Sequence, residues 1–158
     1  MSTLVMKFGG TSVGSVEAID QTSDIIIAQA QAWDRLVVVV SAMSGVTDAL
    51  IKSAQTAIAD DDEKAFRRII AELRGKHHTT IKTLLPASED RRALLATVDD
   101  LLDELTAFCH SIHILGEVTP RAMDTITSMG ERMNARTVAA VLRHKGGKSQ
   151  GVDATHMV

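Results

Sequence analysis

The chain has 158 residues, a formal net charge of −3 and 45% hydrophobic residues. This composition predicts one soluble globular domain and excludes a disordered chain. Tyrosine is absent and the only aromatic residues are Trp33 and three phenylalanines, so with the acidic charge balance we exclude a nucleic-acid-binding protein. The single cysteine, Cys109, cannot form an internal disulfide, and the longest strongly apolar run, residues 36–40, is far shorter than the ~20 residues that span a bilayer. We therefore expect a cytoplasmic protein without a membrane segment.

The first forty residues have the pattern of a strand, a glycine loop, a helix and a second strand. An apolar run at residues 4–6 stops at a pair of glycines, and Ser15 is placed to cap a helix that extends to Trp33. Residues 36–40 are apolar without alternation, which is typical of a parallel strand covered on both faces. Together these segments predict a βαβ unit. The expected buried stripe of its helix is Val16, Ile19, Ile26, Ala30 and Trp33.

Helical patterns dominate the rest of the chain. Thr47 is placed to cap the first of these helices, and the last starts at Thr119 and Pro120 and reaches about His144. A short third strand is predicted around Val152. The expected buried face of the last helix is Met123, Ile126, Gly130, Met133, Val138 and Val141 or Leu142.

The two helices between these have matching apolar stripes. The acidic residues 60–63 open the first, Pro86 ends it, and Ser88 starts the second. The two stripes predict an antiparallel helical hairpin at about residues 62–115. The first helix carries Phe66, Ile70, Leu73, His77, Ile81 and Leu84, and the second carries a heptad seam of Leu94, Val98, Leu101, Leu105, Phe108, Ile112 and Leu115.

The first candidate for chemistry is the loop KFGGTSVG at residues 7–14, between the first strand and its helix. Amide groups freed by the glycines and the positive end of a helix can surround phosphate oxygens, and Lys7 can neutralise charge that develops on them. The lysine precedes the glycines, so this is not a Walker loop, and the dinucleotide fingerprint GxGxxG is absent. From spacing alone, an ordinary strand-to-helix turn remains the alternative.

Two further segments could share that site. Residues 41–48, SAMSGVTD, follow the second strand and therefore lie at the same sheet edge as the glycine loop. Their alternative role is to satisfy turn and cap hydrogen bonds. Residues 128–132, SMGER, place Gly130 in mid-helix, where glycine costs about 1 kcal/mol relative to alanine, and so predict a close backbone approach. Glu131 beside it lies at the margin of the buried face, and its alternative role is an ordinary solvated charge.

The histidines do not have the spacing of a metal site. His110 and His113 stand beside Cys109 on the heptad-patterned helix, with no further ligand cluster in the sequence. This pattern favours packing or surface roles, so we predict no metal-ligating residue.

Residues 5–14, 38–47 and 128–132 together resemble the aspartokinase family in order and separation, and the resemblance covers essentially the whole chain. The motif KFGGTSV resembles aspartokinases more than the related acetylglutamate, glutamate, uridylate and carbamate kinases. The resemblance implies a three-layer α/β/α amino-acid-kinase fold, here incomplete, helix-rich and with few parallel strands. It also implies transfer of the γ-phosphoryl group of ATP to the side-chain carboxylate of L-aspartate, which is the first step toward lysine, threonine and methionine.

The resemblance implies roles for the matching residues. Lys7 would be the catalytic residue that stabilises the transferring group, with Mg²⁺ bridging the phosphates. Ser41 and Thr47 match positions near the acceptor aspartate, and Glu131 matches the acidic residue that meets its ammonium group. A homo-oligomer is also expected. The expected ATP-binding residues are Lys7, Phe8, Gly9, Gly10 and Ser41, and the expected aspartate-binding residues are Thr47 and Glu131.

Aspartokinases resemble this chain only over their first part. They continue into a second glycine-rich segment, an adenine pocket and paired regulatory ACT domains, none of which has a counterpart here. We therefore expect residues 1–158 to form the amino-terminal part of a kinase domain that is inactive alone. The alternatives are another amino-acid kinase, such as acetylglutamate kinase, and a non-catalytic helical interaction module whose heptad seam docks another chain.

Overall fold

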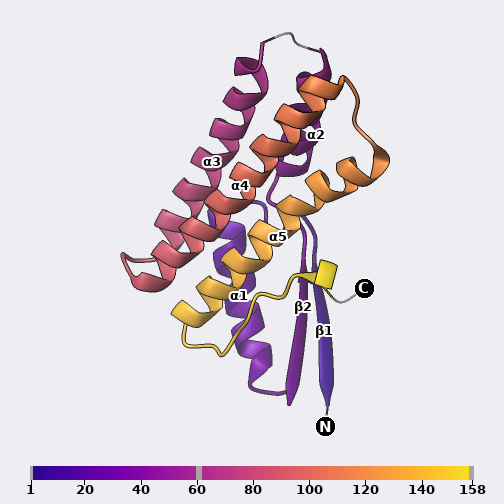
Figure 1. Ribbon diagram of the computed structural model, residues 1–158. Helices are drawn as coiled ribbons and strands as arrows, with labels where there is room; N and C mark the ends of the chain where they lie inside the picture. The colour runs from indigo at the N-terminus through magenta and orange to yellow at the C-terminus, as the bar shows by residue number, and fades with distance from the viewer. Residues whose placement is uncertain (1, 60–61, 157–158) are drawn as a thin grey trace.

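The structure is a computed structural model that describes residues 2–59 and 62–156 (Figure 1). Its described part is a helix-rich α/β fold with two parallel strands, which confirms the predicted class. None of the described helices is long and apolar enough to cross a membrane. The elements in chain order are β1 (Thr3–Phe8), α1 (Val16–Ala30), β2 (Arg35–Val40), α2 (Val46–Ala59), α3 (Lys64–Leu84), α4 (Glu89–Leu115), α5 (Pro120–His144) and the short 3₁₀ helix η1 (Ala154–His156).

The two strands are paired in parallel, with Phe8 opposite Val40 at their carboxyl ends. One face of the sheet packs against the helical core through Phe8, Leu36, Val38 and Val40. The prediction that the second strand is covered on both faces is wrong, because the described helices lie on one side of the sheet only (Figure 1). Every second side chain therefore faces outward, and the apolar ones among these are Val5, Val37 and Val39, which are 62%, 44% and 48% exposed.

The predicted third strand is also not present in the described residues. Val152 lies in an irregular segment that runs back along α5 and ends in η1 (Figure 1). Side-chain hydrogen bonds hold this segment to α5 instead of strand pairing, as Ser149 Oγ donates to the carbonyl of Ala139 at 2.7 Å. A strand needs a neighbouring strand edge to pair with, and α5 offers none.

Capping residues define three helix starts and one helix end as predicted. Ser15, Ser88 and Thr119 each accept a hydrogen bond from the amide three residues further on, at 3.1–3.2 Å. Gly116 ends α4 in the left-handed conformation, with φ of 72°. These positions are predictable because a cap depends on the residues beside it in sequence.

Two helix ends differ from the prediction. Thr47 does not cap α2, because the helix already begins at Val46 and its first backbone bond runs from the Ala49 amide to the Gly45 carbonyl. Gly45 has φ of 75°, which turns the chain into the helix. In α1, the helix ends at Ala30, which is exposed, and Trp33 lies in the following turn with 38% of its surface exposed.

Helices α3 and α4 run antiparallel beside each other, and α2 packs against both of them and against α5 (Figure 1). Five of the seven residues predicted for the α4 seam are buried, and Phe108 is half-buried. Leu115 is the exception at 73% exposed, because α4 ends there without a covering neighbour. The stripe on α3 is buried from Phe66 to Ile81 as predicted.

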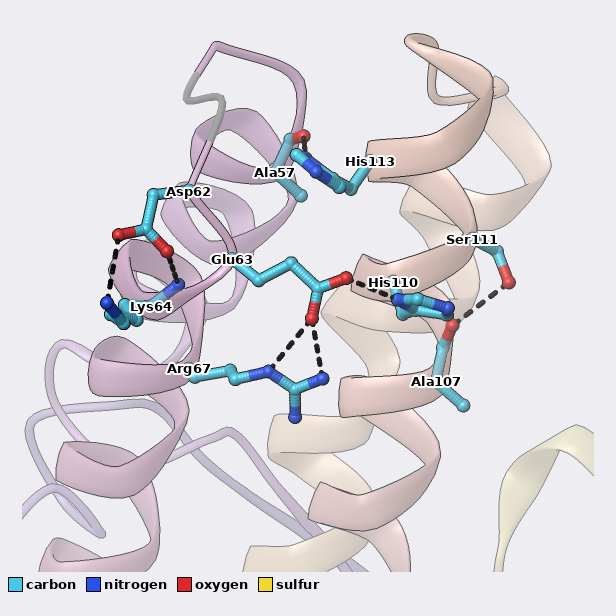
Figure 2. A network of polar contacts seen from close by, with 9 residues as sticks. All are labelled: Ala57, Asp62, Glu63, Lys64, Arg67, Ala107, His110, Ser111 and His113. Atoms are coloured by element: carbon cyan, nitrogen blue, oxygen red, sulfur yellow. Dashed lines mark hydrogen bonds and ion pairs between the residues drawn. The ribbon is translucent and has the colours of Figure 1, made fainter.

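Two histidines on α4 hold the ends of α2 and α3 (Figure 2). His110 Nδ1 lies 2.6 Å from Glu63 Oε1, and His113 Nδ1 lies 3.1 Å from the carbonyl oxygen of Ala57. Both therefore have packing roles in the bundle, which agrees with the sequence interpretation. Of the predicted acidic helix start, residues 60 and 61 lie outside the described residues, and Glu63 is the N-cap residue of α3.

Candidate functional site

The carboxyl ends of the two strands bring two loops together. Because β1 and β2 are in parallel register, the glycine loop after Phe8 and the loop after Val40 leave the sheet side by side. The Ser41 amide donates to the Phe8 carbonyl at 3.1 Å and extends the strand pairing by one bond. We call residues 9–15 the glycine loop and residues 41–45 the second loop.

The glycine loop is a tight turn that leads into the amino terminus of α1. The Ser12 amide donates to the Gly9 carbonyl at 2.9 Å, and Ser15 then caps the helix. A Cβ on Gly9 would meet nothing within 4 Å, so the loop is open to solvent at this point. An open glycine turn in front of a helix amino terminus can present amide groups to phosphate oxygens.

The two loops pack tightly at Gly14. A Cβ on this residue would come within 2.1 Å of Ser44 Oγ, so only glycine fits. The Ser44 amide donates to the Gly14 carbonyl at 3.4 Å, and its hydroxyl donates to the Gly10 carbonyl at 3.5 Å. The second loop is thus fixed against the first by Ser44.

Lys7 and Phe8 point to opposite faces of the sheet. The Lys7 side chain is exposed on the outer face, in register with Val39. Phe8 packs its ring against the core, so only its backbone faces the loops. Lys7 is therefore free to reach a ligand at the sheet edge, whereas a contact from Phe8 would come from its main chain.

Ser41 is half-buried at the start of the second loop, and Thr47 is half-buried in the first turn of α2. Glu131 comes from α5 and is also half-buried. Its carboxylate makes no hydrogen bond or ion pair to any residue of 2–59 or 62–156, so it can receive a cationic group. Gly130 brings this part of α5 against the second loop, which is the close approach that the sequence predicts.

The last residue of the SMGER motif faces away from the loops. Arg132 Nε donates to Asp153 Oδ2 at 2.7 Å and fixes the carboxyl-terminal segment to α5. Burial raises the pKa of the Asp153 carboxyl, but hydrogen bonds from Thr155 and Arg132 outweigh burial and hold that pKa well below its usual range. Arg132 therefore has a structural role in this chain.

Sequence reasoning missed two side chains at the loops. Asn134 of α5 donates to the Ser41 carbonyl at 2.7 Å and to the Val13 carbonyl at 3.3 Å. Lys76 of α3 donates through Nζ to the Ser44 carbonyl. Asn134 lies one helical turn after Gly130, and this spacing on a buried face was the available signal. The contact of Lys76 depends on tertiary packing and had no such signal.

The described residues contain no group of three or more His, Cys, Asp or Glu side chains that could hold a metal ion. Two shallow concavities of the described surface lie around Arg143 and Asp90, and no candidate residue lines them. Around the two loops, the candidate residues thus offer backbone amides, the Lys7 ammonium, the Ser41 and Thr47 hydroxyl groups and the Glu131 carboxylate.

A strand, a glycine loop and a helix beside a second polar loop form an α/β unit whose two loops leave the same edge of the sheet. The chain belongs to the amino acid kinase family, whose profile matches residues 2–158. The matched residues include both loops and α5 with Glu131.

Curated relatives are aspartokinases. The chain is 32% identical over 154 residues to the chloroplastic bifunctional aspartokinase/homoserine dehydrogenase 1 of Zea mays, covering 98% of this chain and 16% of the relative. It is 30% identical over 169 residues to the aspartokinase of Schizosaccharomyces pombe, covering 98% of this chain and 30% of the relative. The chain thus spans less than a third of the length of either relative.

The fold is similar to that of E. coli aspartokinase III. The crystal structure of that enzyme with lysine and aspartate matches with a TM-score of 0.74 and 22% identity, covering 93% of this chain and 30% of that one. The structure with aspartate and ADP matches with the same TM-score and 24% identity, covering 92% of this chain and 30% of that one. At this identity the match establishes the fold alone.

Proposed function

We propose that the chain is the amino-terminal part of an aspartate kinase, carrying the phosphate loop and half of the acceptor site. The observation that carries the proposal is that the glycine loop, the second loop and the Gly130–Glu131 segment of α5 meet at one sheet edge. The three segments are the same ones that resemble aspartokinases in sequence. The relatives in maize and fission yeast support this substrate.

In the proposed reaction, a side-chain carboxylate oxygen of L-aspartate attacks the γ-phosphorus of ATP. The bond between that phosphorus and the β,γ-bridging oxygen breaks, which gives 4-phospho-L-aspartate and ADP. The attacking carboxylate is already ionised at neutral pH, so the reaction needs positioning and charge neutralisation more than a general base.

We assign the ATP phosphates to the glycine loop. The backbone of Phe8, Gly9 and Gly10 would donate to phosphate oxygens, and the Lys7 ammonium would neutralise charge on the transferring group. The open space over Gly9 fits such an approach. Mg²⁺ would be held chiefly by the phosphates and would supply further charge neutralisation.

We assign L-aspartate to the side of the second loop. Ser41 opens the second loop beside the end of β1 and would contact the nucleotide phosphates, while the Thr47 hydroxyl would contact the acceptor. Glu131, whose carboxylate is unpaired among the described residues, would receive the ammonium group. We further propose a cytoplasmic homo-oligomer that serves lysine and threonine synthesis.

The test compares the 158-residue chain with the product of the complete reading frame that contains it. Acyl phosphate is trapped with hydroxylamine, with aspartate or N-acetylglutamate as the acceptor. We expect hydroxamate from the complete product with aspartate only, and none from the 158-residue chain alone. Turnover with N-acetylglutamate would favour acetylglutamate kinase, and turnover of the short chain would contradict the assignment of an incomplete site.

A pair of variants tests the acceptor site. Glu131→Gln should raise KM for aspartate by about 10-fold or more while leaving KM for ATP nearly unchanged. Glu117→Gln is the matched control, because Glu117 is exposed and lies in the turn before α5. Equal effects of both substitutions would contradict the role of Glu131.

A non-catalytic interaction module is less well supported. Its docking surface would be the heptad seam of α4, but Leu101 and Leu105 of that seam are buried against the neighbouring helices. The seam is therefore occupied within the chain.

A further inference from the structure

Asn134 connects the two loops of the candidate site from a third element. It lies on α5 and is fully buried. Its Nδ2 group donates one hydrogen bond to the carbonyl of Ser41 at 2.7 Å and another to the carbonyl of Val13 at 3.3 Å. Ser41 opens the second loop, and Val13 belongs to the glycine loop.

The chemistry of the amide matches this position. The NH₂ group of asparagine has two donors, one for each carbonyl, whereas a serine or threonine hydroxyl has one and an aspartate carboxylate has none. A single rigid group thus fixes both carbonyls at once. Ser44 also links the two loops, through two hydrogen bonds that are longer, at 3.4 and 3.5 Å.

The position of Asn134 is itself fixed. One turn earlier, Gly130 places α5 against Ala42, so the helix cannot move away from the second loop without losing this packing. The Oδ1 atom of Asn134 is buried and has no hydrogen-bond partner among the described residues. A buried acceptor without a partner destabilises the fold. A residue that served packing alone would avoid this cost, so the two donors are the reason for an asparagine here.

We propose that Asn134 is a positioning residue that sets the separation between the phosphate-binding loop and the acceptor-binding loop. This inference rests on the proposed function, because it requires ATP on one loop and the acceptor on the other. In-line transfer depends on the alignment of two bound substrates, and a displacement of about 1 Å can cost about 100-fold in rate. Each loop would still bind its own ligand without Asn134.

The kinetic test uses the complete reading-frame product with Asn134→Leu, which keeps the number and branching of the side-chain heavy atoms and removes both donors. We expect kcat to fall by about 10- to 100-fold, while KM for ATP and for aspartate each change by less than about threefold. A residue with a merely structural role would lower the amount of folded enzyme and leave kcat per folded molecule unchanged. That result would overturn the proposal.

Thr137→Val is the matched control. Thr137 is buried one turn further along α5, and its hydroxyl donates to the Met133 carbonyl of its own helix at 3.1 Å. This substitution removes a buried hydrogen bond without touching either loop, so we expect kcat to remain within about twofold of wild type. A loss of kcat equal to that of Asn134→Leu would overturn the proposal.

A second measurement separates this inference from the proposed function. Amide hydrogen exchange of the 158-residue chain should become faster in both loops of Asn134→Leu and Asn134→Ala, with α3 and α4 unchanged. In the wild-type chain, the side-chain NH₂ protons of Asn134 should exchange slowly, which can be measured even if neither variant folds. Fast exchange of these protons would overturn the inference. Inactivity of the wild-type complete product toward aspartate would instead overturn the proposed function.

Discussion

Gly130 of α5 lies directly against Ala42 of the second loop, and a Cβ on Gly130 would come within 2.8 Å of the Cβ of Ala42. The added methyl group would also meet Val46 and Leu50 at 3.3 and 3.4 Å. Gly130→Ala gains about 1 kcal/mol of helix propensity, but overpacking of this kind costs about 1–3 kcal/mol. We expect a net loss of stability, measured as a lower midpoint of urea unfolding.

Gly75 provides the control for that prediction. It also lies within a helix, α3, but it is exposed and a Cβ there would meet nothing within 4 Å. Gly75→Ala should therefore raise the free energy of unfolding by up to about 1 kcal/mol. Stabilisation by both substitutions would show that the contact between α5 and the second loop is looser than described.

The contact at Gly130 was predictable, whereas for Asn134 the sequence indicated a place on the buried face of α5 but not its partners. A glycine in mid-helix is unfavourable by itself, so its presence in the sequence already indicates a close neighbour. An asparagine in mid-helix has several ordinary explanations, and its two partners, Val13 and Ser41, are distant in sequence. The loops themselves were predictable because parallel strands place their carboxyl ends at one edge.

The same distinction applies to the fold. Ser15 was identified as a cap, and Ser88 and Thr119 as helix starts, because the cap bond involves residues three apart. Whether helices pack on one face of β2 or on both was not predictable. A run of valines indicates a strand, but it does not indicate how many helices pack on each face. The start of α2 was predicted incorrectly at Thr47. It depends on the backbone conformation of Gly45, which the residues around Thr47 do not indicate.

The buried seam of α4 predicts a sharp contrast between two leucines. Leu105 is fully buried, whereas Leu115 is 73% exposed at the end of the same helix. Leu105→Asp should unfold the chain, because an unpaired carboxylate would replace a core side chain. Leu115→Asp should change the free energy of unfolding by less than about 0.5 kcal/mol. Circular dichroism and sedimentation of both variants check this. A folded Leu105→Asp variant that lost only self-association would instead support a docking surface.

His77 predicts loss of stability in acid. It is fully buried on α3, and neither ring nitrogen has a hydrogen-bond partner among the described residues. Burial, with repulsion from Lys76 and His78, lowers the pKa of His77 from 6.5 to about 4. Between these pH values the unfolded chain binds the proton and the folded chain does not. The contribution of His77 to the free energy of unfolding is thus constant well above pH 6.5 and falls by up to about 1.4 kcal/mol per pH unit as the pH decreases toward 4.

The measurement compares urea unfolding at pH 7, 6 and 5 for wild type and His77→Leu. The variant should lose less stability than wild type over this range, because its core has no group to protonate. His144→Gln is the control, since His144 is exposed at the end of α5. Its pH dependence should stay parallel to that of wild type. Equal slopes for wild type and His77→Leu would contradict the burial of a neutral imidazole.

Two ion pairs from α5 should differ in strength. Asp153 is buried and accepts hydrogen bonds from Arg132 and Thr155, whereas Asp90 pairs with Arg143 at the surface. Asp153→Asn should cost about 1–3 kcal/mol, because it leaves the half-buried Arg132 without its counter-ion. Asp90→Asn should cost less than about 1 kcal/mol. Limited proteolysis provides a second readout, with faster cleavage in residues 146–156 for Asp153→Asn only.

Two neighbouring valines of β2 have side chains on opposite faces of the sheet, and substitutions of them should differ in cost. Val38 packs against the helical core, and Val39 is 48% exposed on the opposite face. A Val38→Thr substitution places a hydroxyl group among apolar side chains, which costs about 1–3 kcal/mol. Val39→Thr should change the free energy of unfolding by less than about 0.5 kcal/mol, because its side chain already contacts water and threonine keeps the strand tendency. Urea unfolding of the 158-residue chain checks both values. If the two substitutions cost the same, both faces of β2 are covered in solution. Association of two chains through the exposed valines would have this effect, and sedimentation velocity would then detect a dimer.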